Sequence, residues 1–438
     1  MYKKILLIAL LLFYAPAAFA VDKSGLGLDF FDKFNDDCLV YYINLALENN
    51  HDAKQATQTV EQYRQEVKYS FGQELPSFGV SANYLGIKVP KLDNFQLKKN
   101  AFVLPFTANY EADFLLKNRD KTKSAKKSYE AQIYDEKAVY IALLSDTAAV
   151  YTNILQYDEL IKLAAENVDI YTKLLDADIK KYERGVINST QFNNSRKNLE
   201  TAKNTLENIE KEREILLMQL AVLTGISPDE ISALKRGSLE NFEYTGAIPD
   251  YIESDVIYSR PDVMSAEARL EKAKIDIRVA RKDFLPTFNI TGIWAFNTIA
   301  PGTFFSWESS LAAILAGASQ DIFTGGRKIA KLKLQKAKYE ELFENYRQTD
   351  LNAVKEVNTA LCLIKYDTEI NKNTLEKLNY EFQNLTFAKR KSDRGIISQP
   401  EYLSAQSDFI NAQNDAVNAK TQRLINYFTL YKAVGGKL

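Results

Sequence analysis

The residue types that most often perform catalysis or bind metals are scarce in this chain of 438 residues. Its single histidine, His51, lies in a polar stretch, and one histidine without clustered partners makes no zinc site. We therefore expect His51 to be a surface residue. The two cysteines, Cys38 and Cys362, are far apart in helix-forming sequence. They are predicted to be small buried apolar side chains, with a disulfide between them as the alternative.

Glycine clusters and carboxylates offer no stronger catalytic candidates. The stretch Thr324-Gly325-Gly326-Arg327 lacks the spacing of a phosphate-binding loop. Pairs of Asp and Glu are numerous, but they fall on long amphipathic helices, where they are typical of solvated faces. A net charge of -1, without Lys/Arg clusters among aromatic residues, indicates no nucleic-acid partner. The sequence predicts no enzyme, no catalytic residue, no cofactor and no metal site.

The first twenty residues have the pattern of a secretory signal. Lys3 and Lys4 precede a short apolar run, and Ala18-Phe19-Ala20 forms a small-x-small cleavage site. The apolar run is too short to span a membrane as a helix. We expect a mature protein that begins at Val21 and is exported from the cytoplasm.

Two isolated glycines divide very long helix-forming runs. Gly185 is the only glycine between Gly86 and Gly225, and Gly395 is the only one between Gly326 and Gly435. Glycine readily adopts the left-handed conformation that ends a helix. Each Arg-Gly pair is therefore predicted to be the turn of a long helical hairpin, and the two hairpins indicate an internal duplication.

Other landmarks recur in the same order in both halves of the chain. Leu75-Pro76-Ser77-Phe78 matches Leu285-Pro286-Thr287-Phe288, and the stretch that ends at Arg119 matches the one that ends at Arg327. We divide the chain into a signal peptide, 1–20; an N-terminal segment with the first helix, 21–75; a strand pair, 76–114; a helical hairpin, 115–225; a linker, 226–259; and, for the second repeat, a helix, 260–284, a strand pair, 285–323, and a hairpin, 324–438.

The predicted strands alternate between apolar and polar residues. From Phe102 to Phe114 the even positions are apolar and the odd ones are mostly polar, and a similar alternation follows Phe288. Four strands are predicted, near 76–88, 99–114, 285–297 and 304–321. An ordinary half-buried sheet explains this pattern, and so do tilted transmembrane strands. Because four strands cannot close a barrel in lipid, the second explanation requires an oligomer, in which three chains supply about twelve strands.

The helix predicted from Lys117 to Glu183 would be about 100 Å long. It carries two series of mostly apolar residues in steps of three and four, which predict neighbouring helices on two sides. A compact helical bundle and helix walls around a hollow both fit this pattern. The first series is Val150, Ile154, Tyr157, Ile161, Ala164, Val168, Tyr171 and Leu175, and the second is Leu160, Leu163, Asn167, Ile170 and Leu174.

Several motifs resemble the TolC-like outer-membrane efflux and secretion proteins. The most specific are the stretch from Arg260-Pro-Asp through Ala266-Glu-Ala-Arg269-Leu, the stretch Val279-Ala-Arg281-Lys-Asp-Phe284-Leu-Pro286, and Asp321-Ile-Phe-Thr-Gly-Gly-Arg327. The resemblance covers essentially the whole mature chain. It implies a mostly α-helical fold with a small β part, in which duplicated hairpins form a trimeric α-barrel tunnel and four strands per chain join a trimeric outer-membrane β-barrel.

The resemblance also implies partners and a location. We expect a homotrimer in outer-membrane lipid, with a long periplasmic extension, in a Gram-negative bacterium. A periplasmic adaptor (a membrane fusion protein) and an inner-membrane pump of RND, ABC or MFS type would complete the machine. The expected function is a passive exit duct for tripartite efflux or type I secretion, gated at its periplasmic tip, whose cargo the sequence does not identify. The alternative is a soluble periplasmic helical scaffold.

The resemblance places a pore constriction at the tip, where family members often have carboxylates six and nine residues after the second turn glycine. Those positions hold Glu401 and Ser404, and Gln191 is equivalent to Glu401 in the first repeat. Glu401 is either a gate residue or an acid of the first helical turn, where the helix dipole favours it. The expected adaptor contacts are Arg184, Gly185, Val186, Arg394, Gly395 and Ile396, and the two arginines have helix capping as their alternative role.

Overall fold

The computed structural model describes residues 25–88, 98–227, 235–249, 251–298, 305, 307 and 310–438. The predicted signal peptide and cleavage site lie outside this part of the chain. The chain forms two compact units, each assembled from separate segments. Unit 1 contains 1–57, 140–252 and 357–438, and unit 2 contains 58–139 and 253–356.

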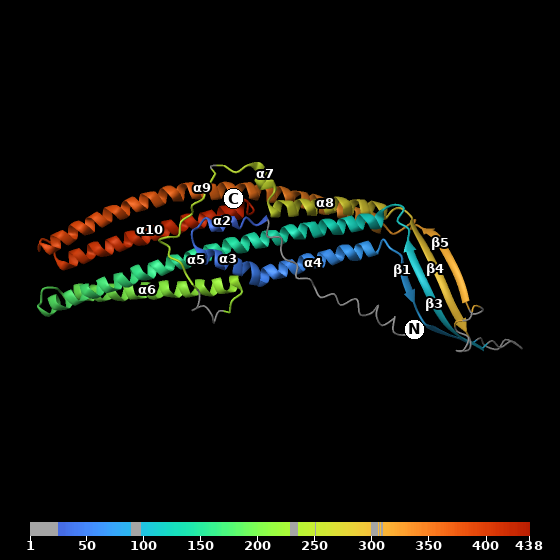
Figure 1. Ribbon diagram of the computed structural model, residues 1–438, viewed down its shortest axis with the longest axis horizontal. Helices are drawn as coiled ribbons and strands as arrows, with labels where there is room; N and C mark the ends of the chain where they lie inside the picture. Colours follow the sequence, from blue (N-terminus) through green and yellow to red (C-terminus); the bar gives the residue numbers. More distant parts are fainter. Residues whose placement is uncertain are drawn as a thin grey trace. The chain divides into compact units, whose positions relative to one another are not determined.

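The two predicted hairpins are present (Figure 1). The first consists of α5 (Lys117–Glu183) and α6 (Ser189–Thr224), and the second consists of α9 (Arg327–Asp393) and α10 (Gln399–Ala433). The long helix expected over 117–183 is therefore confirmed. The remaining helices are α2 (Asp29–Asp32), α3 (Asp37–Asn49), α4 (His51–Gly72), α7 (Ser254–Tyr258) and α8 (Pro261–Lys282).

The first helix of the mature chain, predicted to be continuous, is interrupted at Asn50. Asn50 ends α3 with an extended backbone, and its side-chain oxygen then accepts a hydrogen bond of 2.9 Å from the Ala53 backbone nitrogen. Asparagine at this position caps the start of α4. The Asn50 side chain also donates a hydrogen bond to the Leu223 carbonyl at 3.0 Å. This bond links the junction between α3 and α4 to the end of α6.

Helix α5 has neighbours on two sides in unit 1, as its two apolar series predicted. Asp178 and Tyr182 follow Leu175, the last residue of the first series, on the same side of the helix, and both contact α6. Asp178 accepts a hydrogen bond from Ser195 of α6, and Tyr182 stacks on Phe192 of α6 with ring centroids 4.8 Å apart. The second series faces α10, where Ile170 packs with Leu403 and Ile410, and Ser407 donates to Asn167 at 3.1 Å.

The core of unit 1 is rich in aromatic side chains from distant parts of the sequence. Phe428 of α10 is fully buried and lies against Phe30, Phe31 and Phe34 of the N-terminal segment, with the Phe34 ring 4.7 Å away. Phe242, from the predicted linker, stacks on Phe34 at 5.4 Å. The linker is therefore part of the core over its described residues, despite its lack of periodicity.

Polar contacts hold the same linker against α3 and α5. Tyr151 donates to the Asp36 carboxylate at 3.0 Å and accepts from the Gly237 backbone nitrogen at 2.9 Å. Asp36 also caps α3 by accepting from the Cys38 and Leu39 nitrogens. A Cβ atom at Gly237 would lie 2.1 Å from an Asp36 carboxylate oxygen, so only glycine fits this close approach.

Unit 2 contains one antiparallel sheet. Its strands are β1 (Ser77–Val80), β2 (Asn83–Lys88), β3 (Lys98–Glu111), β4 (Thr287–Thr298) and β5 (Ser310–Ser319). The order is β1-β3-β4-β5, and β2 pairs with β3 beyond β1, so β1 and β2 share one edge position (Figure 1).

The prediction of a single strand near 76–88 is therefore wrong in detail. β1 pairs with 106–109 and β2 with 98–103, and the interruption faces Pro105 of β3. Proline has no N–H to donate to a neighbouring strand, so a regular ladder cannot continue past it. The sheet keeps the four predicted strand positions. Part of the fourth prediction, 304–321, lies outside the described residues.

Both cysteines are free, so no disulfide forms. Cys38 is half-buried and Cys362 is exposed on α9, which makes the expectation of two buried side chains wrong. The helical pattern around Cys362 predicted a core position, but among the described residues much of α9 remains exposed. His51 is exposed at the first turn of α4, as expected.

Candidate functional site

The turns of the two hairpins have the same backbone geometry. In the first, the Val186 nitrogen donates to the Lys181 carbonyl at 2.8 Å and the Gly185 nitrogen donates to the Tyr182 carbonyl at 2.9 Å. In the second, Ile396 and Gly395 donate to Lys391 and Ser392 at the same two distances. This pair of bonds is the Schellman motif that ends α-helices.

Both turn glycines adopt the predicted left-handed conformation, with φ of 70° at Gly185 and 68° at Gly395. No atom lies within 4 Å of a Cβ built at either position, so the requirement for glycine comes from the backbone alone. The adjoining apolar side chains are exposed, Val186 by 69% and Ile396 by 66%. Arg184 and Arg394 are exposed as well, so all six expected adaptor contacts lie on the surface of the described chain.

After each turn, the next helix begins with a capping box. The Ser398 nitrogen and hydroxyl donate to the Glu401 carboxylate at 2.7 and 3.0 Å, and the Glu401 nitrogen donates back to the Ser398 hydroxyl. Asn188 and Gln191 make the equivalent reciprocal pair at the start of α6. A carboxylate and an amide thus have the same structural role in the two repeats.

The hydrogen bonds to Glu401, first from the Ser398 backbone and then from its hydroxyl, lower the pKa of the Glu401 carboxyl. Glu401 is therefore ionised at neutral pH. Glu401, Ser404 and Gln191 are all exposed, whereas Leu403 between the first two is buried against α5. The structure shows the capping role of Glu401 directly, and its role in a pore constriction stays a prediction.

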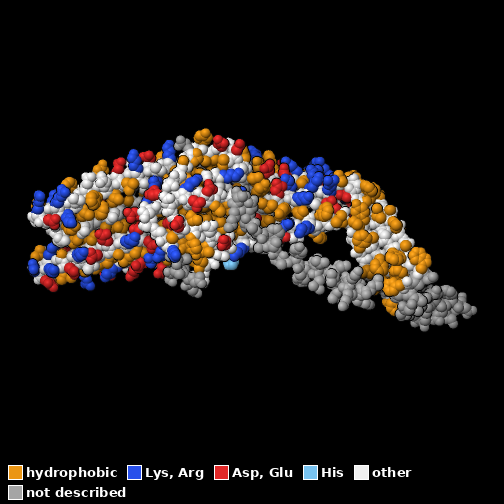
Figure 2. Space-filling model, viewed as in Figure 1, with side chains coloured by type: hydrophobic (Ala, Val, Ile, Leu, Met, Phe, Trp, Pro, Cys, Tyr) orange, Lys and Arg blue, Asp and Glu red, His pale blue; other side chains and the backbone are white. Residues whose placement is uncertain are grey.

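A groove beside the first turn carries positive charge. It has a volume of about 430 Å³ and is lined by the end of α5, by the turn residues Arg184 and Val186, and by Gln399 at the start of α10. Figure 2 shows Lys and Arg side chains at the turn ends of the hairpins. Lys180 and Arg184 form no ion pair within the described residues, whereas Lys181 pairs with Asp178. The charged residues lining the groove are Lys173, Asp176, Lys180, Lys181 and Arg184.

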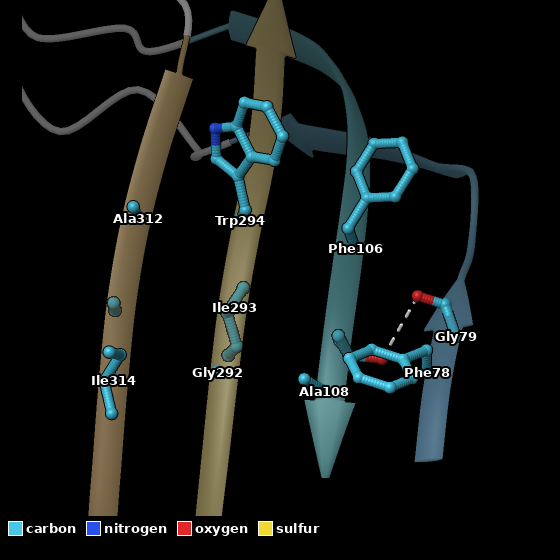
Figure 3. Close-up of a pocket in the computed structure, with 11 residues that line it drawn as sticks. Phe78, Gly79, Phe106, Ala108, Gly292, Ile293, Trp294, Ala312 and Ile314 are labelled. Atoms are coloured by element: carbon cyan, nitrogen blue, oxygen red, sulfur yellow. Dashed lines mark hydrogen bonds between the residues drawn. The ribbon is translucent and has the colours of Figure 1, made fainter. Parts of the chain in front are cut away.

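The sheet of unit 2 has an apolar face and a polar face. Phe106 lies opposite Trp294 in the β3–β4 ladder, with ring centroids 6.1 Å apart, and Trp294 lies opposite Ala312. Figure 3 shows these side chains with Phe78 and Ile314 around an apolar hollow of about 660 Å³. The alternation predicted from the sequence is therefore confirmed for β3 and β4, whereas β5 has apolar residues on both faces, with Leu311 and Leu315 on the face opposite Trp294.

The other face is polar where the strands join the helices. Thr291 donates to the Asn109 side chain at 3.1 Å across β3 and β4, and the Thr287 and Ser319 hydroxyls lie 3.0 Å apart across β4 and β5. Two pockets, lined partly by these residues, lie at this end of the sheet. Trp294 is 48% exposed and Ile314 is 82% exposed. An aromatic face this exposed, backed by a polar face, is typical of strands between lipid and water.

Comparison with known proteins identifies the family. The sequence profile of the outer membrane efflux proteins matches residues 42–226 and 254–436, one match for each repeat. The chain belongs to the outer membrane efflux protein family. It is an outer-membrane exit duct for efflux, as the sequence predicted, and the relatives are channel and transport proteins rather than enzymes.

Individual relatives match this efflux protein over nearly its whole length. The cation efflux system protein CusC of Escherichia coli O157:H7 is 24% identical over 435 residues, covering 96% of this chain and 92% of the relative. The outer membrane protein OprJ of Pseudomonas aeruginosa is 25% identical over 433 residues, covering 95% and 88%.

Solved structures confirm the fold class. The Campylobacter jejuni CmeC outer membrane channel has a TM-score of 0.87 and 25% identity, covering 96% of this chain and 90% of that one. The open state of the Neisseria gonorrhoeae MtrE outer membrane channel has a TM-score of 0.80 at 22% identity, covering 94% and 92%. The solved channels of this fold are trimers with a helical tunnel and a β-barrel. The predicted outer-membrane location is confirmed as well.

Proposed function

We propose that three copies of this chain form a passive exit duct that is gated at the hairpin turns and docked there by a periplasmic adaptor. The observation that best supports a trimer is that the sheet is open at both edges. Its edges, β1 with β2 on one side and β5 on the other, pair with no further strand among the described residues. Unpaired backbone groups are very costly in lipid, so the edges require neighbouring chains.

The exposed face of α9 supports the same assembly. Large apolar side chains recur along it, including Leu363 (38% exposed), Tyr366 (61%) and Ile370 (52%). These residues are spaced three and four apart and therefore form a continuous stripe. A stripe of this size is typical of an interface with another helix. In a homotrimer it would lie against the neighbouring chain.

The gate is the second part of the proposal. Three-fold symmetry would place three Glu401 carboxylates around the axis at the tip, and Ser404 would add no second charged ring. The low pKa of Glu401 keeps that ring charged at neutral pH. We therefore expect the ring to attract cations without forming a strong divalent site.

The variant Glu401→Gln separates the gate charge from the helix cap. Glutamine keeps the capping box, as Gln191 shows in the first repeat. We expect a small loss of thermal stability at neutral pH, because the amide keeps the capping bonds but not the charge, together with a cation-to-anion permeability ratio about twofold to fivefold lower at low salt. Reversal potentials of the trimer in a planar bilayer measure this ratio. An unchanged permeability ratio would show that the Glu401 charge does not contribute to the gate.

The capping contribution of Glu401 also predicts a pH dependence. Because its pKa is lowered in the folded chain, this stabilisation is complete above the pKa of the unfolded chain and is lost as the pH falls through the folded pKa. Glu401→Gln removes this titration. The wild type should therefore lose more stability than the variant when both are moved from neutral to acidic pH.

The basic groove supports adaptor docking at the tip and specifies its chemistry. Lys180 and Arg184 lie in the groove beside the exposed Val186. Cations without acidic partners beside an apolar anchor suit a partner that presents carboxylates around an apolar side chain. The adaptor tip is expected to have this composition.

Reversing these charges tests the docking. We expect Lys180→Glu combined with Arg184→Glu to weaken binding of the purified cognate adaptor at least about tenfold, mainly through slower association, as measured by surface plasmon resonance. Lys372→Glu, an exposed position on α9, is the matched control. Equal binding by the double variant and the wild type would place the adaptor elsewhere.

The exit duct itself is tested by conductance. The purified trimer should form discrete channels in a planar bilayer, and loosened tips should raise the current. Currents that never exceed the leak, even after the tips are loosened, would favour the soluble periplasmic scaffold. The inner-membrane pump (RND, ABC or MFS type) would supply the energy, and the cargo is set by that pump.

A further inference from the structure

A second basic site lies in unit 2, at the junction between the sheet and the helices. It is a pocket of about 380 Å³. Its charged lining consists of four cations, Lys117, Arg327, Lys328 and Lys331, and two carboxylates, Asp283 and Asp321. The cations come from the N-terminal parts of α5 and α9, where residues 117–129 and 327–339 contain twelve Lys and Arg residues against one acid.

This distribution is unusual for helix N-termini. The helix dipole favours acidic residues in the first turn and disfavours cations. The first turn of α9 contains no acid, and it begins with Arg327 and Lys328. At α9 this arrangement opposes the helix dipole and favours a nearby negative charge, whereas α5 has Asp120 in its first turn and the Asp113 carboxylate accepting from its first backbone nitrogens.

The two carboxylates of the pocket supply only part of that charge. Asp283 accepts from both Lys117, at 2.6 Å, and Lys331, at 2.7 Å, and Asp321 pairs with Lys328 at 3.3 Å. The single carboxylate of Asp283 is therefore shared by two lysines and neutralises only one of their charges. The Arg327 side chain forms no ion pair within the described residues, so the pocket keeps an excess of positive charge.

The pocket opens on the polar face of the sheet. Thr287 and Ser319 line it, and their hydroxyls lie 3.0 Å apart on the face opposite Trp294. In the barrel of the proposed duct this face meets water, whereas the aromatic face meets lipid. A ligand of this pocket therefore arrives through the aqueous channel.

The electrostatic surroundings agree with an electropositive pocket. Burial lowers the pKa of the nearby Lys121 ammonium, and the charge of Lys117 lowers it further. Burial raises the pKa of the Asp283 carboxyl, but the hydrogen bonds and the charges of Lys117 and Lys331 together bring it below its usual range. Figure 2 shows Lys and Arg side chains gathered over α8 and the adjoining part of α9.

We propose that this pocket, formed by Lys117, Arg327, Lys328 and Lys331, binds a phosphate or carboxylate group of an anionic molecule inside the duct. Arg327 supplies a planar donor fork that suits both kinds of oxyanion, and the lysines act as point charges around it. The site would occur three times around the axis of the trimer. It would attract anionic cargo to the foot of the barrel. This proposal rests on the proposed duct.

The first experiment measures block of the channel current by tripolyphosphate added on the barrel side of a planar bilayer. We expect Arg327→Gln combined with Lys331→Gln to require about tenfold more tripolyphosphate than the wild type, with block in both weakening as salt is raised. Lys355→Gln combined with Lys372→Gln, two exposed positions further along α9, is the control and should behave as the wild type. Absence of block in a conducting wild type, or equal block in both channels, would overturn the site.

A second measurement does not depend on conduction. Isothermal titration calorimetry of the trimer in detergent should detect tripolyphosphate binding by the wild type and about tenfold weaker binding by the Arg327/Lys331 variant. Binding without any channel current would contradict the duct but keep the site. If native mass spectrometry shows that the variant loses only bound phosphatidylglycerol, while tripolyphosphate binding is unchanged, then the pocket is a lipid site and the aqueous ligand is excluded.

Discussion

Trp294→Arg is expected to destabilise the membrane-embedded trimer by about 2–4 kcal/mol per chain. Trp294 lies near the middle of β4 on the aromatic face, beside Phe106 and opposite Ala312. A cation placed there must leave water and enter hydrocarbon, and the cost of that transfer is greatest near the middle of the bilayer.

The matched control is the next residue. Ile293→Arg introduces the same cation at nearly the same depth, but on the opposite face of the strand, which meets water in the proposed barrel. We expect this variant to cost much less. Urea denaturation of both variants in lipid vesicles measures the difference. Equal losses from the two substitutions would show that the sheet does not separate lipid from water.

Phe428→Ala is expected to destabilise unit 1 by about 3–5 kcal/mol. The Phe428 side chain is fully buried, and it joins α10 to the rings of Phe30, Phe31 and Phe34. Alanine would leave a cavity among rigid rings that cannot collapse to fill it. Because these contacts attach the N-terminal segment, its proteolysis should also accelerate.

Tyr41→Ala serves as the control for this prediction. Tyr41 is an aromatic residue of the same unit, but it is 55% exposed, so its removal should change the free energy of unfolding by less than about 1 kcal/mol. Denaturation followed by circular dichroism compares the two variants. A loss at Phe428 no greater than at Tyr41 would mean that the aromatic cluster does not hold unit 1 together.

The elements that follow from local chemistry were predictable from the sequence. Gly185 and Gly395 are the only residues in their long runs that adopt a left-handed conformation without strain, so the turns could be located directly. The alternation from Phe102 onward predicted the two faces of the sheet, because side chains alternate strictly along a strand.

The predictions of a continuous first helix and a continuous first strand were wrong because one residue interrupts an otherwise regular pattern. Asn50 ends a helix without proline or glycine, and its capping preference was the available signal. Pro105 has no N–H to donate, and this interrupts the edge between β1 and β2. The alternation of apolar and polar residues gives no sign of such a break. The basic pocket around Arg327 was missed because its residues come from segments about 200 positions apart, and only the fold brings Lys117 to Asp283 and Lys331.

We expect three chains to close one barrel and one tunnel. Electron microscopy of protein extracted from outer membranes in mild detergent tests it most directly. The particles should be elongated, well over 100 Å long, with three-fold symmetric end views, consistent with helices of 67 residues. Compact particles without three-fold symmetry, or a protein that stays in solution without detergent, would contradict it.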